Sequence, residues 1–96
     1  MKIWLDDVRP APDGWEWYQY PEVLVLELST IWNDIDAMSL DHDLGEGHLT
    51  GYDVVKHIEE MVKVEGYVLE FPITVHSANP VGVQNMRAGI ASCMRF

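Results

Sequence analysis

The sequence predicts a compact three-layer α/β sandwich around a four-stranded, mainly parallel sheet. Short apolar segments that stop abruptly at polar residues alternate with longer segments whose apolar residues recur at helical spacing. The alternation holds from residue 15 onward, and a chain of 96 residues has enough material for one core but not for two. We therefore expect a single domain over residues 1–96, with right-handed crossovers between its strands.

Four segments are predicted as strands. Residues 2–6 form a short apolar run that ends in acid, as expected of a strand buried on both faces. Aromatic strand formers fill residues 15–19, after a turn rich in proline. Residues 37–41 and 72–77 complete the sheet, and we expect the spatial order two-one-three-four. The linker before the second strand, about eight residues, is short for a parallel crossover, so the direction of that strand stays open.

Three helices are expected. Residues 21–33 begin at a proline, which suits a first helical turn. Residues 51–64 follow Thr50, and Asp53 three residues later completes the spacing of a capping box. Residues 80–94 begin at a proline that follows an asparagine, a good N-cap. The apolar residues expected on the inner face of this last helix are Val83, Met86, Ile90 and Met94.

The net charge excludes several classes of partner. Six Lys and Arg stand against sixteen Asp and Glu, so the formal net charge is −10. This charge disfavours binding to a nucleic-acid polymer and to an anionic membrane. No apolar run approaches the ~20 residues that span a bilayer. The start of the chain is strand-like rather than a secretory signal, so we expect a cytoplasmic protein, and the single Cys93 is expected to be a packing residue without an internal disulfide.

Acidic side chains gather where two of the strands end. In an open parallel α/β sheet, ligands bind beyond the carboxyl ends of the strands. Clustered carboxylates repel one another unless they are protonated or bridged by a cation, and oxygen-rich sites suit hard divalent metals. The expected ligands of such a metal, Mg²⁺ or Mn²⁺, are Asp6, Asp7, Asp41 and Asp43. The alternative is that some of these acids only cap helices or turns.

Two histidines flank the same strand ends. His42 and His76 could supply an acid and a base on opposite sides of a phosphate, because imidazole titrates near neutral pH. Together with Asp41 they are the catalytic candidates. Each histidine could instead be a structural residue with satisfied hydrogen bonds. We expect His57 to be solvated surface and His48 to be peripheral.

The start of the last helix is a candidate phosphate site. Free N–H groups at a helix N-terminus favour an anion. Ser77 and Asn79 stand beside this helix start, and Arg9 could supply a cation near the site. A surface ion pair between Arg9 and Asp7 or Asp13 is an equally good interpretation of the spacing.

Several of these runs match a known pattern. The Asp6-Asp7 pair, Asp41 and Ser77 resemble the acid pair, the phosphoacceptor and the hydroxyl position of response-regulator receiver domains. The chain more specifically resembles the cyclic-phosphate processing receiver-like domain family over nearly its whole length. The runs that carry this resemblance are residues 5–10, 39–45, 50–53 and 76–80 together with Gly82.

The resemblance implies a flavodoxin-like, receiver-like fold and an activity on cyclic phosphates of small nucleotides or nucleotide derivatives. Compared with ordinary receivers, the chain has too few residues between Asp7 and Trp15 for the first helix and ends before a fifth strand with its lysine. The two histidines are a further departure. The resemblance therefore implies a trimmed receiver fold and puts aspartyl phosphorylation as a signalling switch in doubt.

Three functions remain open from the sequence. The leading hypothesis is a metal-dependent phosphoesterase, a hydrolase that opens a cyclic phosphate of a small nucleotide or nucleotide derivative. A second is a non-catalytic module that sequesters or senses the same small ligand. A third is a degenerate receiver used for protein interaction, with Asp41 phosphorylated or permanently bare.

Overall fold

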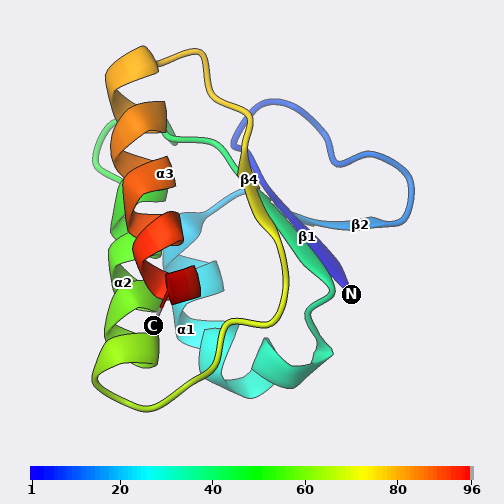
Figure 1. Ribbon diagram of the computed structural model, residues 1–96. Helices are drawn as coiled ribbons and strands as arrows, with labels where there is room; N and C mark the ends of the chain where they lie inside the picture. Colours follow the sequence, from blue (N-terminus) through cyan, green and yellow to red (C-terminus); the bar gives the residue numbers. More distant parts are fainter. Residues whose placement is uncertain (96) are drawn as a thin grey trace.

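The sheet has four parallel strands. The computed structural model describes residues 1–95, and within them the strand order is β2-β1-β3-β4 (Figure 1). The strands are β1 (Lys2–Leu5), β2 (Trp15–Tyr18), β3 (Ala37–Leu40) and β4 (Ile73–Val75). The predicted order is confirmed, and each observed strand is slightly shorter than its predicted range. β2 pairs parallel to β1. Because β1 has only four residues, a short loop without a helix is long enough to return the chain to the start of the sheet.

The helices follow the expected positions. They are α1 (Pro21–Ile31), continued by the 3₁₀ segment η1 (Trp32–Asp34), then α2 (Gly51–Lys63) and α3 (Pro80–Arg95). The capping box of α2 is confirmed, because Asp53 N–H donates to Thr50 Oγ1 and Thr50 N–H donates to the Asp53 carboxylate. Within residues 1–95 no helix is long and apolar enough to cross a bilayer.

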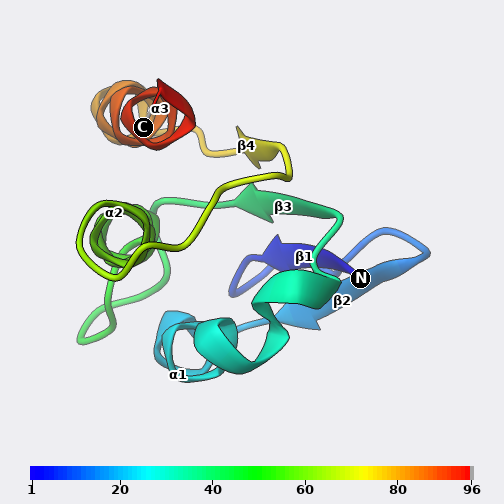
Figure 2. The same cartoon turned by 60° about the horizontal axis from the view of Figure 1, so that its bottom comes forward.

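The helices all lie on one face of the sheet, so the domain has two layers rather than the expected three (Figures 1 and 2). α2 packs against both α1 and α3, in one row. The two crossovers that contain α1 and α2, from β2 to β3 and from β3 to β4, step in the same direction along the sheet. Right-handed connections that step in the same direction place their helices on the same face. Only the β1 to β2 connection steps the other way, and it contains no helix.

The hydrophobic core lies between the sheet and this row of helices. Ile3 and Leu5 of β1 are fully buried, as are Leu24 and Leu28 of α1. α2 contributes the most regular stripe, which consists of Val54, Val55, Ile58, Met61 and Val62. On α3 the expected inner face is partly wrong, because Met94 is 63% exposed and Cys93 takes the inner position.

Aromatic side chains cover part of the opposite face of the sheet. The parallel register places Trp4 beside Trp17 on one side and Ser39 on the other. The rings of Trp4 and Trp15 meet edge to face, with centroids 6.1 Å apart, and the ammonium of Lys2 lies over the Trp15 ring. These contacts shelter the face that no helix covers.

The first turn of α2 passes very close to the end of β3. A Cβ atom built on Gly51 would lie 1.9 Å from the backbone carbonyl oxygen of Asp41. We expect Gly51→Ala to lower the free energy of unfolding by about 1–3 kcal/mol, because backbone rather than a side chain must move. Urea denaturation followed by circular dichroism measures this change.

Glu60→Ala, an exposed position on the same helix, is the control and should stay within about 0.5 kcal/mol of the wild type. Equal urea midpoints for Gly51→Ala and the wild type would contradict the close approach of α2 to Asp41.

Candidate active site

Asp6 is a buried carboxylate at the end of β1. Its side chain is 1% exposed, and its Oδ1 accepts hydrogen bonds from the backbone N–H groups of Val8 at 2.9 Å and Arg9 at 2.7 Å. Its Oδ2 lies 3.1 Å from Nε2 of His76. Burial raises the pKa of Asp6, but these two N–H groups and the His76 ring outweigh it and leave the pKa below its usual value. Asp6 is therefore ionised at neutral pH.

Arg9 pairs with Asp6. The Nε of its guanidinium lies 3.4 Å from Asp6 Oδ2, while its side chain remains 57% exposed. Arg9 therefore reaches from the β1–β2 loop to the end of β1, and its outer N–H groups remain accessible to solvent. The observed partner of Arg9 is therefore Asp6, and not Asp7 or Asp13, which the sequence spacing also allowed.

Three of the four predicted acids converge. Asp6, Asp7 and Asp41 each offer a carboxylate oxygen, and these oxygens lie within 4.8 Å of one another. Asp6 and Asp41 are buried and Asp7 is half-buried. The parallel pairing of β1 with β3 explains the convergence, because Leu5 pairs with Leu40 and the next residue of each strand is acidic. A group of this kind has the oxygen ligands that hard divalent cations prefer.

Asp43 lies outside this group. Its side chain is 66% exposed, and its Oδ1 lies 2.9 Å from Nδ1 of His42. Asn79 Nδ2 reaches the same oxygen at 3.5 Å. The His42 ring, with a further contribution from Asn79, lowers the pKa of Asp43. The structure therefore joins Asp43 to His42 rather than to the other acids.

His42 presents a free ring nitrogen. Its Nδ1 bonds to Asp43, and within residues 1–95 nothing bonds to its Nε2. A Cβ atom on Gly82 would lie 2.5 Å from the His42 ring, so the start of α3 fixes one side of this imidazole. A carboxylate only accepts hydrogen bonds, so Asp43 favours the tautomer with a proton on Nδ1 and a lone pair on Nε2. This arrangement suits a general base.

His76 has both ring nitrogens engaged. Nε2 faces Asp6, and Nδ1 lies 2.6 Å from Oγ of Ser39, which is itself buried. The ring stacks on Trp4 at a centroid distance of 3.8 Å with an interplanar angle of 5°. Burial lowers the pKa of His76 more than Asp6 raises it, so the ring is neutral at neutral pH. Nε2–H then donates to Asp6, and the Ser39 hydroxyl donates to Nδ1.

The start of α3 is largely capped by its own residues. Asn79 Oδ1 accepts from Gly82 N–H at 3.0 Å, which confirms the predicted N-cap, and Asn79 N–H donates to Ser77 Oγ at 3.2 Å. These bonds use the N–H groups of Asn79 and Gly82, which were expected from the sequence to be free for a phosphate. The Ser77 hydroxyl proton remains as a donor at this edge.

The other two histidines lie apart from this centre. His48 bonds through Nδ1 to Glu22 at 2.9 Å, and Glu22 also accepts Leu49 N–H at 2.7 Å. These contacts fasten the β3–α2 loop to the start of α1. His57 is half-buried on α2 and carries no role in this arrangement.

Ser39 and Trp4 also belong to the site, although they were not predicted from the sequence. Ser39 is the only hydroxyl residue in β3, where the other side chains are apolar, and that isolated polarity was the available signal. Trp4 carries no comparable signal, because its stacking on His76 depends on packing across the sheet.

The Ser39 hydroxyl holds His76 in place, and its loss has a measurable cost. We expect Ser39→Ala to destabilise the fold by about 1–3 kcal/mol, because Nδ1 of a largely buried ring loses its donor. Urea denaturation gives the free energy, and the ¹⁵N shifts of the His76 ring report the lost bond.

Ser29→Ala is the matched control, because Ser29 is exposed on α1. If the two variants unfold alike and the His76 shifts do not change, the Ser39 contact has no stabilising role.

Comparison with known proteins agrees with this architecture. Searches of curated proteins and of solved structures return no match. A family model described as the cyclic-phosphate processing receiver domain matches residues 1–92, nearly the whole chain. The acid pair after β1, the acid after β3 and the Ser-Ala pair after β4 lie at one edge of a parallel sheet, as the resemblance implied. The chain therefore belongs to the family of cyclic-phosphate processing receiver domains.

Proposed function

We propose that this domain is a metal-dependent phosphoesterase that hydrolyses the cyclic phosphate of a small nucleotide or nucleotide derivative. The observation that carries the proposal is a pairing of two features at one edge of the sheet. Three carboxylates converge there, and directly after one of them His42 has an unbonded Nε2, with Asp43 at its Nδ1. The family name supplies the cyclic phosphate as the substrate class.

Asp6, Asp7 and Asp41 would hold a divalent cation. Carboxylate oxygens at this spacing repel one another without a cation, and their hardness suits Mg²⁺ or Mn²⁺. When bound, such an ion would polarise a phosphoryl oxygen and offset developing charge. Asp43 is left out of this ligand set, because its Oδ1 is already shared by His42 and Asn79.

His42 is the proposed general base. Its Nε2 takes a proton from the attacking water while Asp43 stabilises the imidazolium that forms. The oxygen of that water bonds to phosphorus, one ring P–O bond breaks, and the leaving sugar oxygen takes a proton from solvent. His42 then releases its proton to solvent, so the net reaction adds one water to the cyclic phosphate and yields a monoester.

His76 is a positioning residue in this proposal. Both of its ring nitrogens are bonded within the protein, so it lacks a free nitrogen for substrate. Its Nε2–H instead holds the Asp6 carboxylate toward Asp7 and Asp41. We propose this indirect role for His76 in place of the proton transfer that the sequence suggested.

Arg9 and Ser77 are the proposed phosphate contacts. Arg9 uses Nε for Asp6 and keeps its outer N–H groups exposed, and guanidinium suits the geometry of phosphate oxygens. Ser77 has accepted a bond from Asn79 N–H and can still donate its hydroxyl proton. Asn79 contributes mainly by capping α3 and by contacting Asp43.

If Asp7 binds a metal ion, Asp7→Asn should weaken metal binding but should not destabilise the metal-free protein. Asp7→Asn should lower affinity for Mg²⁺ or Mn²⁺ by about tenfold or more, since one of three ligands loses its charge. Without metal the same variant should be as stable as the wild type or more stable, because like-charge repulsion is relieved. Isothermal titration calorimetry and thermal unfolding measure the two quantities.

Asp13→Asn removes the same charge from an exposed turn and is the matched control. A wild type that shows neither heat nor a thermal shift with Mg²⁺, Mn²⁺ or Ca²⁺ sinks the metal assignment.

The two histidines should respond differently to glutamine. His42→Gln should lower turnover of a 2′,3′-cyclic nucleotide by about 10²–10⁴-fold, because an amide cannot accept the proton. His76→Gln should retain at least roughly a tenth of wild-type turnover, because its amide can still donate to Asp6. His57→Gln is the control and should match the wild type. Product formation is followed by chromatography in the presence of Mg²⁺ or Mn²⁺.

A sequestering module gives another pattern. It would bind the nucleotide in a thermal-shift assay but form no product with any of these variants or with the wild type. Equal loss of turnover in the two Gln variants would restore direct proton transfer by His76.

A further inference from the structure

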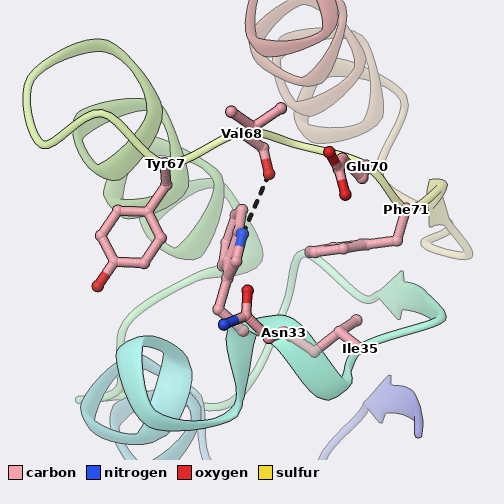
Figure 3. Close-up of a pocket in the computed structure, with 7 residues that line it drawn as sticks. Asn33, Ile35, Tyr67, Val68, Glu70 and Phe71 are labelled. Atoms are coloured by element: carbon pink, nitrogen blue, oxygen red, sulfur yellow. Dashed lines mark hydrogen bonds between the residues drawn. The ribbon is translucent and has the colours of Figure 1, made fainter.

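Trp17 of β2 leaves much of its ring in solvent, with 42% of the residue exposed. Trp32 is a contrast, because it meets both Tyr67 and Phe71 edge to face and is only 6% exposed (Figure 3). Its Nε1–H donates to the carbonyl of Val68, so this ring serves the packing of its end of the sheet. Trp17 instead has a free aromatic surface on which another flat group can lie.

Trp17 lines a hollow of about 330 Å³ that is formed by β2, the short β2–α1 connection and α1. Tyr20 also lines this hollow, and it is 53% exposed. β2 is an edge strand of the sheet, so this side of it is open to solvent. The volume lies at the small end of the range of ligand pockets, roughly 300–1,000 Å³. The hollow therefore suits one ring system rather than a whole nucleotide.

Both exposed rings are held in place by contacts with the protein. Trp17 Nε1–H donates to the backbone carbonyl of Asp6 at 2.8 Å. The Tyr20 ring lies against the His48 ring, with centroids 5.6 Å apart. A side chain that is already fixed loses little conformational entropy when a ligand binds to it. The hollow is therefore pre-organised for a flat group.

The bond from Trp17 to Asp6 places the hollow next to the candidate active site. Arg9, a proposed phosphate contact, pairs with the carboxylate of the same Asp6 whose carbonyl holds Trp17. In a nucleotide, a single sugar joins the base to the phosphate. A phosphate at Arg9 therefore leaves the base of the same molecule near Trp17.

The charge of the hollow suits the base rather than the phosphate. The described residues that line it include Glu16 and Glu27 but no Lys or Arg, so the hollow repels a phosphate. Glu27 accepts the Tyr18 hydroxyl, whereas Glu16 and Gln19 are exposed. A carboxylate and an amide supply the acceptors and the donor that the polar edge of a base requires. Stacking combined with hydrogen bonds to the base edge is a common mode of base recognition.

We propose that this hollow is the base subsite of the domain, with Trp17 as the stacking platform and Tyr20 as a second aromatic contact. The inference rests on the proposed phosphoesterase function and narrows its substrate class. The substrate is a cyclic phosphate whose sugar carries an aromatic base, rather than a cyclic phosphate of a sugar alone.

Two substrates with the same cyclic phosphate test the role of the base. 2′,3′-Cyclic AMP carries adenine, whereas methyl β-D-ribofuranoside 2,3-cyclic phosphate carries a methoxy group in its place. In Mg²⁺ or Mn²⁺, kcat/KM should be about tenfold to hundredfold higher for cyclic AMP, because only adenine stacks on Trp17. Equal kcat/KM for the two substrates would overturn the base subsite and leave the proposed phosphoesterase intact.

Two variants separate the ring of Trp17 from its hydrogen bond. Trp17→Leu and Trp17→Phe both lose the bond to the Asp6 carbonyl, but only Trp17→Phe keeps an aromatic ring. Trp17→Leu should lose most of the preference for cyclic AMP over the riboside, and Trp17→Phe should keep part of it. A purely structural role would lower turnover of both substrates equally and leave the preference unchanged, which would overturn the platform. Leu26→Ala, at a position that is 80% exposed on α1 outside the hollow, is the control and should keep the wild-type preference.

A binding experiment without turnover separates the subsite from the reaction. Adenosine and methyl β-D-ribofuranoside are titrated into ¹⁵N-labelled protein, and the Trp17 indole N–H and the Tyr20 amide are followed. Adenosine should shift both resonances, and the riboside should shift neither. Shifts with adenosine but no product from any cyclic nucleotide would reject the phosphoesterase and keep the base subsite. No shift with adenosine would overturn the base subsite, whatever the turnover.

Discussion

Asp6 is the constraint on which the site depends. A carboxylate with 1% of its surface exposed is costly unless hydrogen bonds and opposite charge replace the lost water. The replacements come from the β1–β2 loop through Val8 and Arg9, and from the end of β4 through His76. The backbone carbonyl of Asp6 also accepts the indole N–H of Trp17 in β2. Through its carboxylate and its backbone carbonyl, Asp6 thus links β1 to β2, to the end of β4 and to the β1–β2 loop at the edge where the chemistry is proposed.

The burial of Asp6 gives His42 and His76 different hydrogen-bond partners. His76 is the partner of the buried acid, so Ser39 and Trp4 hold its ring inside the protein. His42 lies one residue after Asp41, beyond the end of β3, and it pairs with the exposed Asp43. Two histidines with similar positions after neighbouring strands therefore receive different environments. Strand position alone does not decide which of them is free to exchange a proton.

The sequence predicted the parts that local patterns determine. The apolar runs, the prolines at helix starts and the Thr50–Asp53 capping box determined the elements and their order. The acids at strand ends followed from the general placement of sites in parallel sheets, and three of the four converge. The number of layers was wrong because a third layer requires a helix in the one connection that steps toward β2, and that connection is a loop. The pairing of Asp43 with His42 and the bond from Ser39 to His76 depend on side-chain directions that spacing does not specify.

Helix polarity gives the two ends of the domain different chemistry. Each helix runs back from the carboxyl edge of the sheet, so helix N-termini with partial positive charge collect beside Asp7 and Asp41. Gly51 and Gly82 allow the starts of α2 and α3 to approach Asp41 and His42 closely. That partial positive charge is complementary to the phosphate that the proposed reaction needs. The opposite end of the sheet collects the helix C-termini, which carry partial negative charge. A single row of helices on one face thus directs its N-termini to the edge that holds the acids, because all of its dipoles point the same way.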